Sequence, residues 1–204
     1  MSVLLPFLLL FPLFMLAVMV HEVSHGLVAL ALGDSTARDA GRLTLNPLRH
    51  IDPVGTLALP LLLLSMHLPA FGWAKPVPIN VLNLRRPKRD MLWVGAAGPA
   101  ANFLFAAAGA GLLSVFGGAL PALAAELARY LIQINLVLGT FNLLPIPPLD
   151  GSRVLTSLLP LPLARWMLSM ERWGFLFVFA LLYLGVLDKL IWPAVEFLAR
   201  MLGL

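Results

Sequence analysis

The chain has 204 residues, of which 60% are hydrophobic and only 12% are charged. Soluble domains carry about 25% charged residues, so this composition excludes an ordinary water-soluble protein and indicates that lipid is part of the solvent. The formal net charge is +4, but the basic residues occur in short stretches between apolar segments. That pattern is typical of membrane proteins and argues against nucleic-acid binding. The sequence contains no cysteine, which excludes disulfides and thiolate metal sites.

The first long apolar segment covers residues 3–33 and contains a polar group at residues 21–25. Residues 1–37 contain no Lys or Arg, so the basic start of a signal peptide is missing and we expect a retained transmembrane helix. At 1.5 Å per residue the segment is longer than the roughly 30 Å hydrocarbon layer, so we expect it to tilt or protrude. In the polar stretch that follows, alternation at residues 42–45 predicts a short strand on the cytoplasmic side.

Residues 53–71 are apolar but are interrupted by proline and glycine, and basic stretches lie on both sides of them. A full crossing would place these basic stretches on opposite sides of the membrane, which the positive-inside rule disfavours. A re-entrant segment buried by other helices would keep both stretches cytoplasmic. We therefore predict that residues 53–71 enter and leave the membrane on the same side.

The rest of the chain contains further apolar segments at residues 91–117, 123–144, 173–187 and 190–204, the last of which is a short span or an interfacial helix. The predicted fold is an all-α integral membrane protein with about five to six membrane segments and an outside N-terminus. We expect a single membrane-embedded domain over residues 1–204, with a core at 3–155 and C-terminal helices at 160–204.

The strongest chemical motif is His21-Glu22-Val23-Ser24-His25. The spacing i, i+4 places both imidazoles on one helix face, near enough to share one tetrahedral metal ion. Glu22 is adjacent to the first histidine and can reach a metal-bound water as general base. Ionisable residues inside a membrane span cost a few kcal/mol or more, which marks them as functional candidates. A polar packing cluster and a proton or ion relay are the alternative interpretations.

Two histidines leave a catalytic zinc site incomplete, because such a site usually has three protein ligands. Asp150 follows a proline-rich break at a helix end, where the backbone can turn the carboxylate inward. An Asp before Gly is, however, more typical of a turn. His50, Asp52 and His67 are rival ligands, and the residue pattern alone leaves the choice open.

The chain resembles the site-2 protease family, the intramembrane zinc metalloproteases also called peptidase family M50. The resemblance is carried by His21–His25, by the segment Asn142–Gly151 (NLLPIPPLDG) and by Gly98–Phe103 (GPAANF), in the order of the family. It implies that Asp150 is the third ligand of one Zn²⁺ per chain. It also implies that Asn142 lies near the metal, where its amide stabilises the oxyanion. We interpret Asn102, within GPAANF, as a helix-packing contact.

The stretches Gly41–Pro47 and Phe71–Pro78 resemble the compact bacterial branch of the family, and at this length we expect no PDZ domain. Family members often place a strand between the first two core helices, where a substrate unwound from its helix could add as another strand. The apolar insertion at residues 53–71 departs from the simpler members of the family.

These observations predict an intramembrane zinc metalloendopeptidase in a prokaryotic cell membrane, with its active site toward the cytoplasmic side. The expected partners are the lipid bilayer and the transmembrane or membrane-proximal segments of a protein substrate, and we expect no nucleic acid. One alternative is a metal or proton transporter that uses the same buried cluster. Another is a catalytically inactive binding scaffold, against which the intact Glu22 argues.

Overall fold

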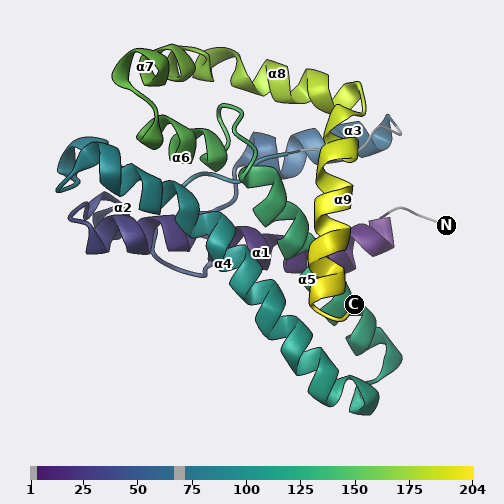
Figure 1. Ribbon diagram of the computed structural model, residues 1–204. Coiled ribbons are helices and arrows are strands. Elements are labelled where there is room, and N and C mark those ends of the chain that lie inside the picture. Colours follow the sequence, from purple (N-terminus) through teal and green to yellow (C-terminus); the bar gives the residue numbers. More distant parts are fainter. Residues whose placement is uncertain (1–3, 67–71) are drawn as a thin grey trace.

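The computed structural model describes residues 4–66 and 72–204, and Figure 1 shows how the elements are arranged. Apolar runs rich in leucine, alanine and glycine form the three longest helices, α1 (Leu4–Ala31), α4 (Pro87–Phe116) and α5 (Ala122–Asn142). Each contains a stretch that is long and apolar enough to cross a membrane. Helices are thus formed where the sequence predicted the first, third and fourth apolar segments.

Helix α4 lies at the centre of the fold, because it packs against α1, α5 and α6 (Asp150–Leu158). Its buried residues include glycines and alanines, and small side chains let helix backbones approach closely. At Gly109 a Cβ would lie only 3.0 Å from Cγ1 of Ile132 on α5. Gly95 lies against α6 and Gly98 lies against α1, so these two helices meet the same stretch of α4.

Shorter elements connect the long helices. Between α1 and α4 lie α2 (Thr36–Asp39), η1 (Pro47–Arg49), the π-helical η2 (Pro53–Ala58), α3 (Leu59–Ser65) and η3 (Val81–Asn83). After α4 come the turn η4 (Gly117–Ala119) and α5, and after α6 come α7 (Leu161–Ser169), α8 (Glu171–Tyr183) and α9 (Val186–Met201).

The strand predicted at residues 42–45 is not formed, and residues 4–66 and 72–204 contain no strand. Arg42 instead donates from Nη2 to the carbonyl oxygen of Lys75 at 2.8 Å. Asn46 accepts the Leu48 N–H at 3.1 Å and so starts the helical turn η1. The backbone of residues 42–45 therefore forms no ladder with a neighbouring strand, and the segment is bent.

The predicted number of five to six membrane segments is not confirmed by the described residues. Three helices qualify as spans, or four if α8 and α9 form one span with a bend of 78°. Gly185, with φ of 66°, provides the left-handed turn at that bend, so the predicted crossing at 173–187 is broken. The 13 residues of α8 make about 20 Å of helix, less than the roughly 30 Å hydrocarbon layer.

The apolar segment at residues 53–71 is described only as far as residue 66. Its described helical part, Pro53–Ser65, is also shorter than a membrane span. This shortness favours the re-entrant interpretation over a full crossing, and the interpretation stays a prediction.

Helix α9 packs along α5, as Figure 1 shows in yellow and green. Leu187, Ile191 and Val195 of α9 join Ile132 and Leu136 of α5 in one buried apolar cluster. The C-terminal helices therefore share a core with the earlier part of the chain, and the single domain over residues 1–204 stays a prediction.

Candidate metal centre

His21 and His25 lie one helical turn apart near the middle of α1, with 6% and 3% of their surfaces exposed. Their ring centroids are 4.7 Å apart, and their Nε2 atoms are 3.0 Å apart. The i, i+4 spacing therefore brings the two ring nitrogens together, as the sequence predicted.

Gly98 of α4 makes the room that the two imidazole rings occupy. A Cβ at this position would lie 2.4 Å from Nε2 of His25 and 2.6 Å from Nε2 of His21. Real Cβ atoms do not approach ring nitrogens so closely, so any larger residue would displace the rings. The backbone of α4 thus forms one wall of the centre.

Asp150 is the first residue of α6 and follows the irregular segment 143–149. This segment folds back tightly, since a Cβ at Gly151 would lie 2.1 Å from the carbonyl oxygen of Leu143. The fold directs the Asp150 carboxylate at the imidazoles, with Oδ2 2.9 Å from Nε2 of His21 and 3.1 Å from Nε2 of His25. Arg153 Nη1 lies 3.5 Å from the other carboxylate oxygen, Oδ1.

The outer nitrogens of both imidazoles face oxygen atoms that can only accept hydrogen bonds. His21 Nδ1 lies 2.6 Å from Oδ1 of Asn102, and His25 Nδ1 lies 2.6 Å from the carbonyl oxygen of Val94. Each Nδ1 must therefore carry the proton that it donates, and in a neutral imidazole this leaves a lone pair on Nε2.

Two Nε2 lone pairs and the Asp150 carboxylate then converge, with separations of 2.9 to 3.1 Å. Three electron-pair donors at this separation repel each other unless a proton or a metal ion lies among them. Zn–N and Zn–O bonds of 2.0–2.2 Å give a tetrahedron with edges of about 3.3–3.6 Å, somewhat longer than these separations. The donor set and its spacing fit a zinc ion. Among the described residues, His21, His25 and Asp150 form the group whose side chains could hold a metal ion together.

Glu22 is half-buried, and its Oε2 accepts the backbone N–H of Val77 at 2.8 Å. Val77 belongs to the extended segment, residues 72–80, which runs beside α1. The Lys75 N–H donates to the carbonyl oxygen of His50 at 2.8 Å, and the Asn80 N–H donates to Asp34 at 2.7 Å. The extended segment is therefore held to both the carboxylate of Glu22 and the end of α1.

The rival ligands have other partners. His50 is fully buried, and its Nε2 donates to the carbonyl oxygen of Thr44 at 2.8 Å. Asp52 caps η2 by accepting the N–H groups of Val54 and Gly55 at 3.0 and 2.7 Å. His67 lies outside the described residues.

The two asparagines that the sequence singled out have different surroundings. Asn142 is half-buried, and its Nδ2 donates to Leu138 of its own helix at 3.0 Å, so its predicted role at the oxyanion stays a prediction. Asn102 does pack between helices, but it also contacts the His21 ring. The signal was available, because Gly98 and Asn102 lie one turn apart on one face of α4.

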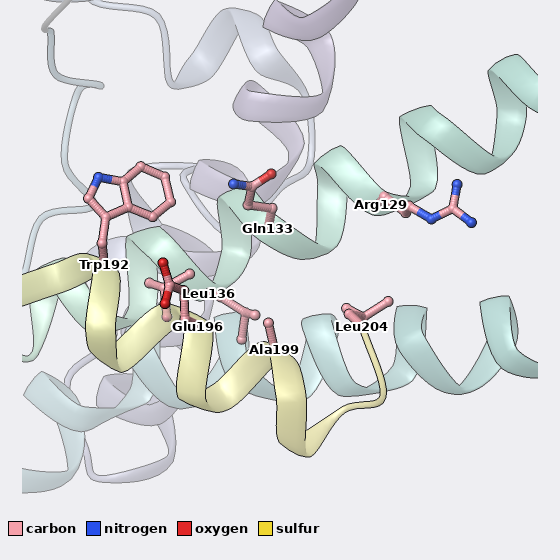
Figure 2. A pocket seen from close by; sticks show the side chains of 8 residues that line it. Arg129, Gln133, Leu136, Trp192, Glu196, Ala199 and Leu204 are labelled. Carbon is pink, nitrogen blue, oxygen red and sulfur yellow. The ribbon is translucent and has the colours of Figure 1, made fainter.

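A cavity of about 370 Å³ lies elsewhere, between α5 and α9. Figure 2 shows Gln133 of α5 together with Trp192 and Glu196 of α9 along it. The cavity contains none of the three candidate metal ligands, so the metal centre is defined by converging side chains and not by this space.

Comparison with known proteins gives a consistent picture. Residues 110–184 match the family described as Peptidase family M50. The candidate zinc metalloprotease YwhC of Bacillus subtilis is 40% identical over 181 residues, which cover 85% of this chain and 79% of that protein. The candidate zinc metalloprotease Rip2 of Mycolicibacterium smegmatis is 31% identical over 176 residues, which cover 86% of this chain and 66% of that protein. No solved structure gives a significant match.

Proposed function

The chain belongs to peptidase family M50 and is a zinc metalloprotease, and from this premise we propose that it cleaves peptide bonds within the membrane. The proposed ligands of a single zinc ion per chain are His21, His25 and Asp150. The observation that carries the proposal is the convergence of these buried side chains within 4.8 Å of one another, among helices apolar enough to cross a membrane.

Glu22 is the proposed general base. Zinc, when bound, supplies a Lewis acid that acidifies a water molecule and polarises the scissile carbonyl. Glu22 would take the proton from the attacking water and deliver it to the leaving amine. The Val77 N–H holds Oε2 of Glu22, so we assign the proton transfer to Oε1.

Asn142 is the proposed donor to the oxyanion. Its amide would have to turn from the Leu138 carbonyl oxygen toward the substrate. Giving up one neutral hydrogen bond costs about 1 kcal/mol, which the developing negative charge can offset.

The extended segment is the proposed docking edge for an unwound substrate. Its alternate residues Trp73, Lys75 and Val77 donate their N–H groups to Gly55, His50 and Glu22. In an extended chain the intervening residues direct their backbone groups to the opposite edge. Two of these, Pro76 and Pro78, have no N–H, so that edge offers mainly carbonyl oxygens. A transmembrane substrate that unwinds exposes N–H groups that could pair with them.

We propose that the N-terminus lies outside and that the metal centre lies toward the cytoplasmic side. Residues 34–90 contain eight of the fourteen Lys and Arg residues, and 151–172 contain three more. Lys88, at the start of α4, donates to the carbonyl oxygen of Leu159 at 2.7 Å, which places these two basic regions side by side. The positive-inside rule assigns that end of the molecule to the cytoplasm.

The test uses the purified protein, a labelled transmembrane peptide and the variant Glu22→Gln. We expect zinc to stay bound while the cleavage rate falls about 10²–10⁴-fold, because general base catalysis contributes that much. Asn142→Ala should also lower the cleavage rate and leave the zinc content unchanged. Unchanged cleavage by the zinc-loaded Glu22→Gln variant would show that the proposed mechanism is wrong. Zinc flux into liposomes that survives this substitution would instead support the transporter alternative.

A further inference from the structure

Two asparagines lie in the interior of the bundle beside the metal centre. Asn102 of α4 and Asn135 of α5 are each 0% exposed. Burying an amide without hydrogen bonds costs several kcal/mol, so the contacts of these side chains define how each is oriented. The two amides contact each other and reach α1, and so connect three helices.

The hydrogen bonds give this connection a direction. Asn135 donates from Nδ2 to the carbonyl oxygen of Leu131 at 2.7 Å, which leaves its Oδ1 facing Asn102. Asn102 donates from Nδ2 to that Oδ1 at 2.7 Å and to the carbonyl oxygen of Ala17 at 3.2 Å. Turning the Asn102 amide over would set its oxygen against two other oxygens. Oδ1 of Asn102 therefore has to face Nδ1 of His21.

The two histidines differ in what holds them. The Nδ1 atom of His25 contacts a backbone carbonyl oxygen, that of Val94, which no side-chain substitution removes. The Nδ1 atom of His21 contacts a side chain, which is itself oriented by a second side chain on another helix. Of the two histidines, His21 is therefore the one whose Nδ1 contact depends on neighbouring side chains.

We propose that Asn102 and Asn135 are positioning residues of the zinc site. Asn135 orients Asn102, and Asn102 keeps the proton of His21 on Nδ1, so that Nε2 presents its lone pair to the metal. This inference rests on the proposed function only in that His21 is taken as a zinc ligand. Outer hydrogen-bond partners of metal-bound histidines commonly affect metal affinity 10–100-fold.

The experiment measures the zinc dissociation constant of the purified full-length protein by competition with a chromophoric chelator. We expect Asn102→Leu to weaken zinc binding about 10–100-fold. Asn135→Leu should weaken it less, because Asn135 touches His21 only through Asn102. The double variant should bind zinc no more weakly than Asn102→Leu alone, since the second contact has no effect once the first is lost.

Two conservative variants separate positioning from general packing. Asn102→Asp keeps an oxygen acceptor for the His21 Nδ1–H but loses both N–H donors of the amide, so it should restore only part of the zinc affinity lost in Asn102→Leu. Asn135→Asp keeps the acceptor for Asn102 but loses the donor to the Leu131 carbonyl oxygen, so it should bind zinc more tightly than Asn135→Leu but less tightly than the unchanged protein. Gln133→Leu is the matched control, because Gln133 lies on the same helix but lines the cavity with α9. We expect no change in zinc affinity for that variant.

Equal zinc affinity in the unchanged protein and in folded Asn102→Leu would overturn the proposal. If Asn102→Leu does not fold, the proposal is tested by comparing Asn135→Leu with Asn135→Asp. Equal zinc affinities of these two variants would also overturn the proposal. If the losses of zinc affinity in the two single variants add up in the double variant, Asn135 does not act on His21 through Asn102. Peptide cleavage is measured separately, so absence of cleavage with the expected pattern of zinc affinities would count against the proposed function alone.

Discussion

The metal centre and the outer helix α8 show two different ways of using apolar sequence. Around the centre, His21, Asn102 and Asn135 are nearly or fully buried, and each has a defined hydrogen-bond partner. On α8, Trp173 and Phe177 are 61% and 48% exposed. The structure of the metal centre depends on close backbone packing and on paired polar groups. The exposed face of α8 depends on little more than an apolar surface that lipid can cover. Substitutions should therefore be poorly tolerated in one region and well tolerated in the other.

The largest expected effect comes from adding one methyl group at the centre. Gly98→Ala would place a Cβ within 2.6 Å of both Nε2 atoms of the histidines. We expect at least a 100-fold loss of zinc affinity and loss of cleavage, because the rings must move apart. Zinc content and peptide hydrolysis of the purified variant check this.

Gly111→Ala is the matched control on the same helix, since a Cβ there meets nothing within 4 Å. Alanine is favoured over glycine inside a helix by roughly 0.5–1 kcal/mol, so this variant should be at least as stable as the unchanged protein. Zinc retained at normal affinity in Gly98→Ala would show that the wall formed by α4 is less rigid than we infer.

A smaller effect is expected at Asp34, just beyond the end of α1. Burial alone raises the pKa of Asp34, but the hydrogen bonds from Thr36, Asn80 and Asn83 outweigh it and lower the pKa below its usual value. Asp34 thereby ties the extended segment to α1. Hydrogen bonds to a charged group contribute about 1.5–3 kcal/mol, so Asp34→Asn should lower the thermal midpoint near neutral pH.

The pH dependence of this effect has a defined sign. Because the pKa of Asp34 is lower in the folded protein than in the unfolded chain, its stabilisation is present above the unfolded pKa of about 3.9 and is lost as the pH falls through the folded value. The difference in thermal midpoint between the unchanged protein and Asp34→Asn should therefore shrink below about pH 4. A difference that is constant from pH 3 to pH 7 would contradict the assigned role of the carboxylate.

The smallest effect is expected on α8. Phe177→Ala removes a large exposed side chain and should change stability by less than about 0.5 kcal/mol. Its neighbour Val178 is 3% exposed and belongs to the buried cluster with α5 and α9. Val178→Ala removes fewer atoms but leaves a cavity, so it should destabilise the protein more. Thermal denaturation of the two variants in the same detergent compares their stabilities. If Phe177→Ala were the less stable variant, the contrast between exposed and buried apolar positions would be wrong.

The part of the site that was predictable from the residues alone is local. His21 and His25 converge because helical geometry brings residues i and i+4 together, and no other element has to be placed. Asp150 lies in another segment, so its approach to the histidines depends on how segment 143–149 folds. The residue pattern made it one candidate among several, and only the family resemblance selected it. The spacing of Gly98 and Asn102 puts both on one face of α4, but a single sequence does not specify that this face packs against His21 of α1.

The fold was predictable where apolar length and helix length coincide, as in α1, α4 and α5. It was not predictable at residues 173–187, where the apolar segment is broken at Gly185. At 53–71 the interrupting prolines and glycines did argue against one long helix, and the described helical part, Pro53–Ser65, is short. The alternation at residues 42–45 predicted a strand, but a strand needs a partner, and the neighbouring extended segment is held by side chains and isolated N–H groups.

The proposed ligands come from two places far apart in the chain, since Asp150 is 129 residues beyond His21. During synthesis, α1 therefore enters the membrane long before the residue that would complete the metal site has left the ribosome. Until α6 docks against α4, the growing chain carries two histidines and a glutamate but no complete set of ligands. On the proposed ligand set, a nascent or truncated chain cannot attack neighbouring membrane proteins, so proteolytic activity is delayed until most of the bundle has assembled.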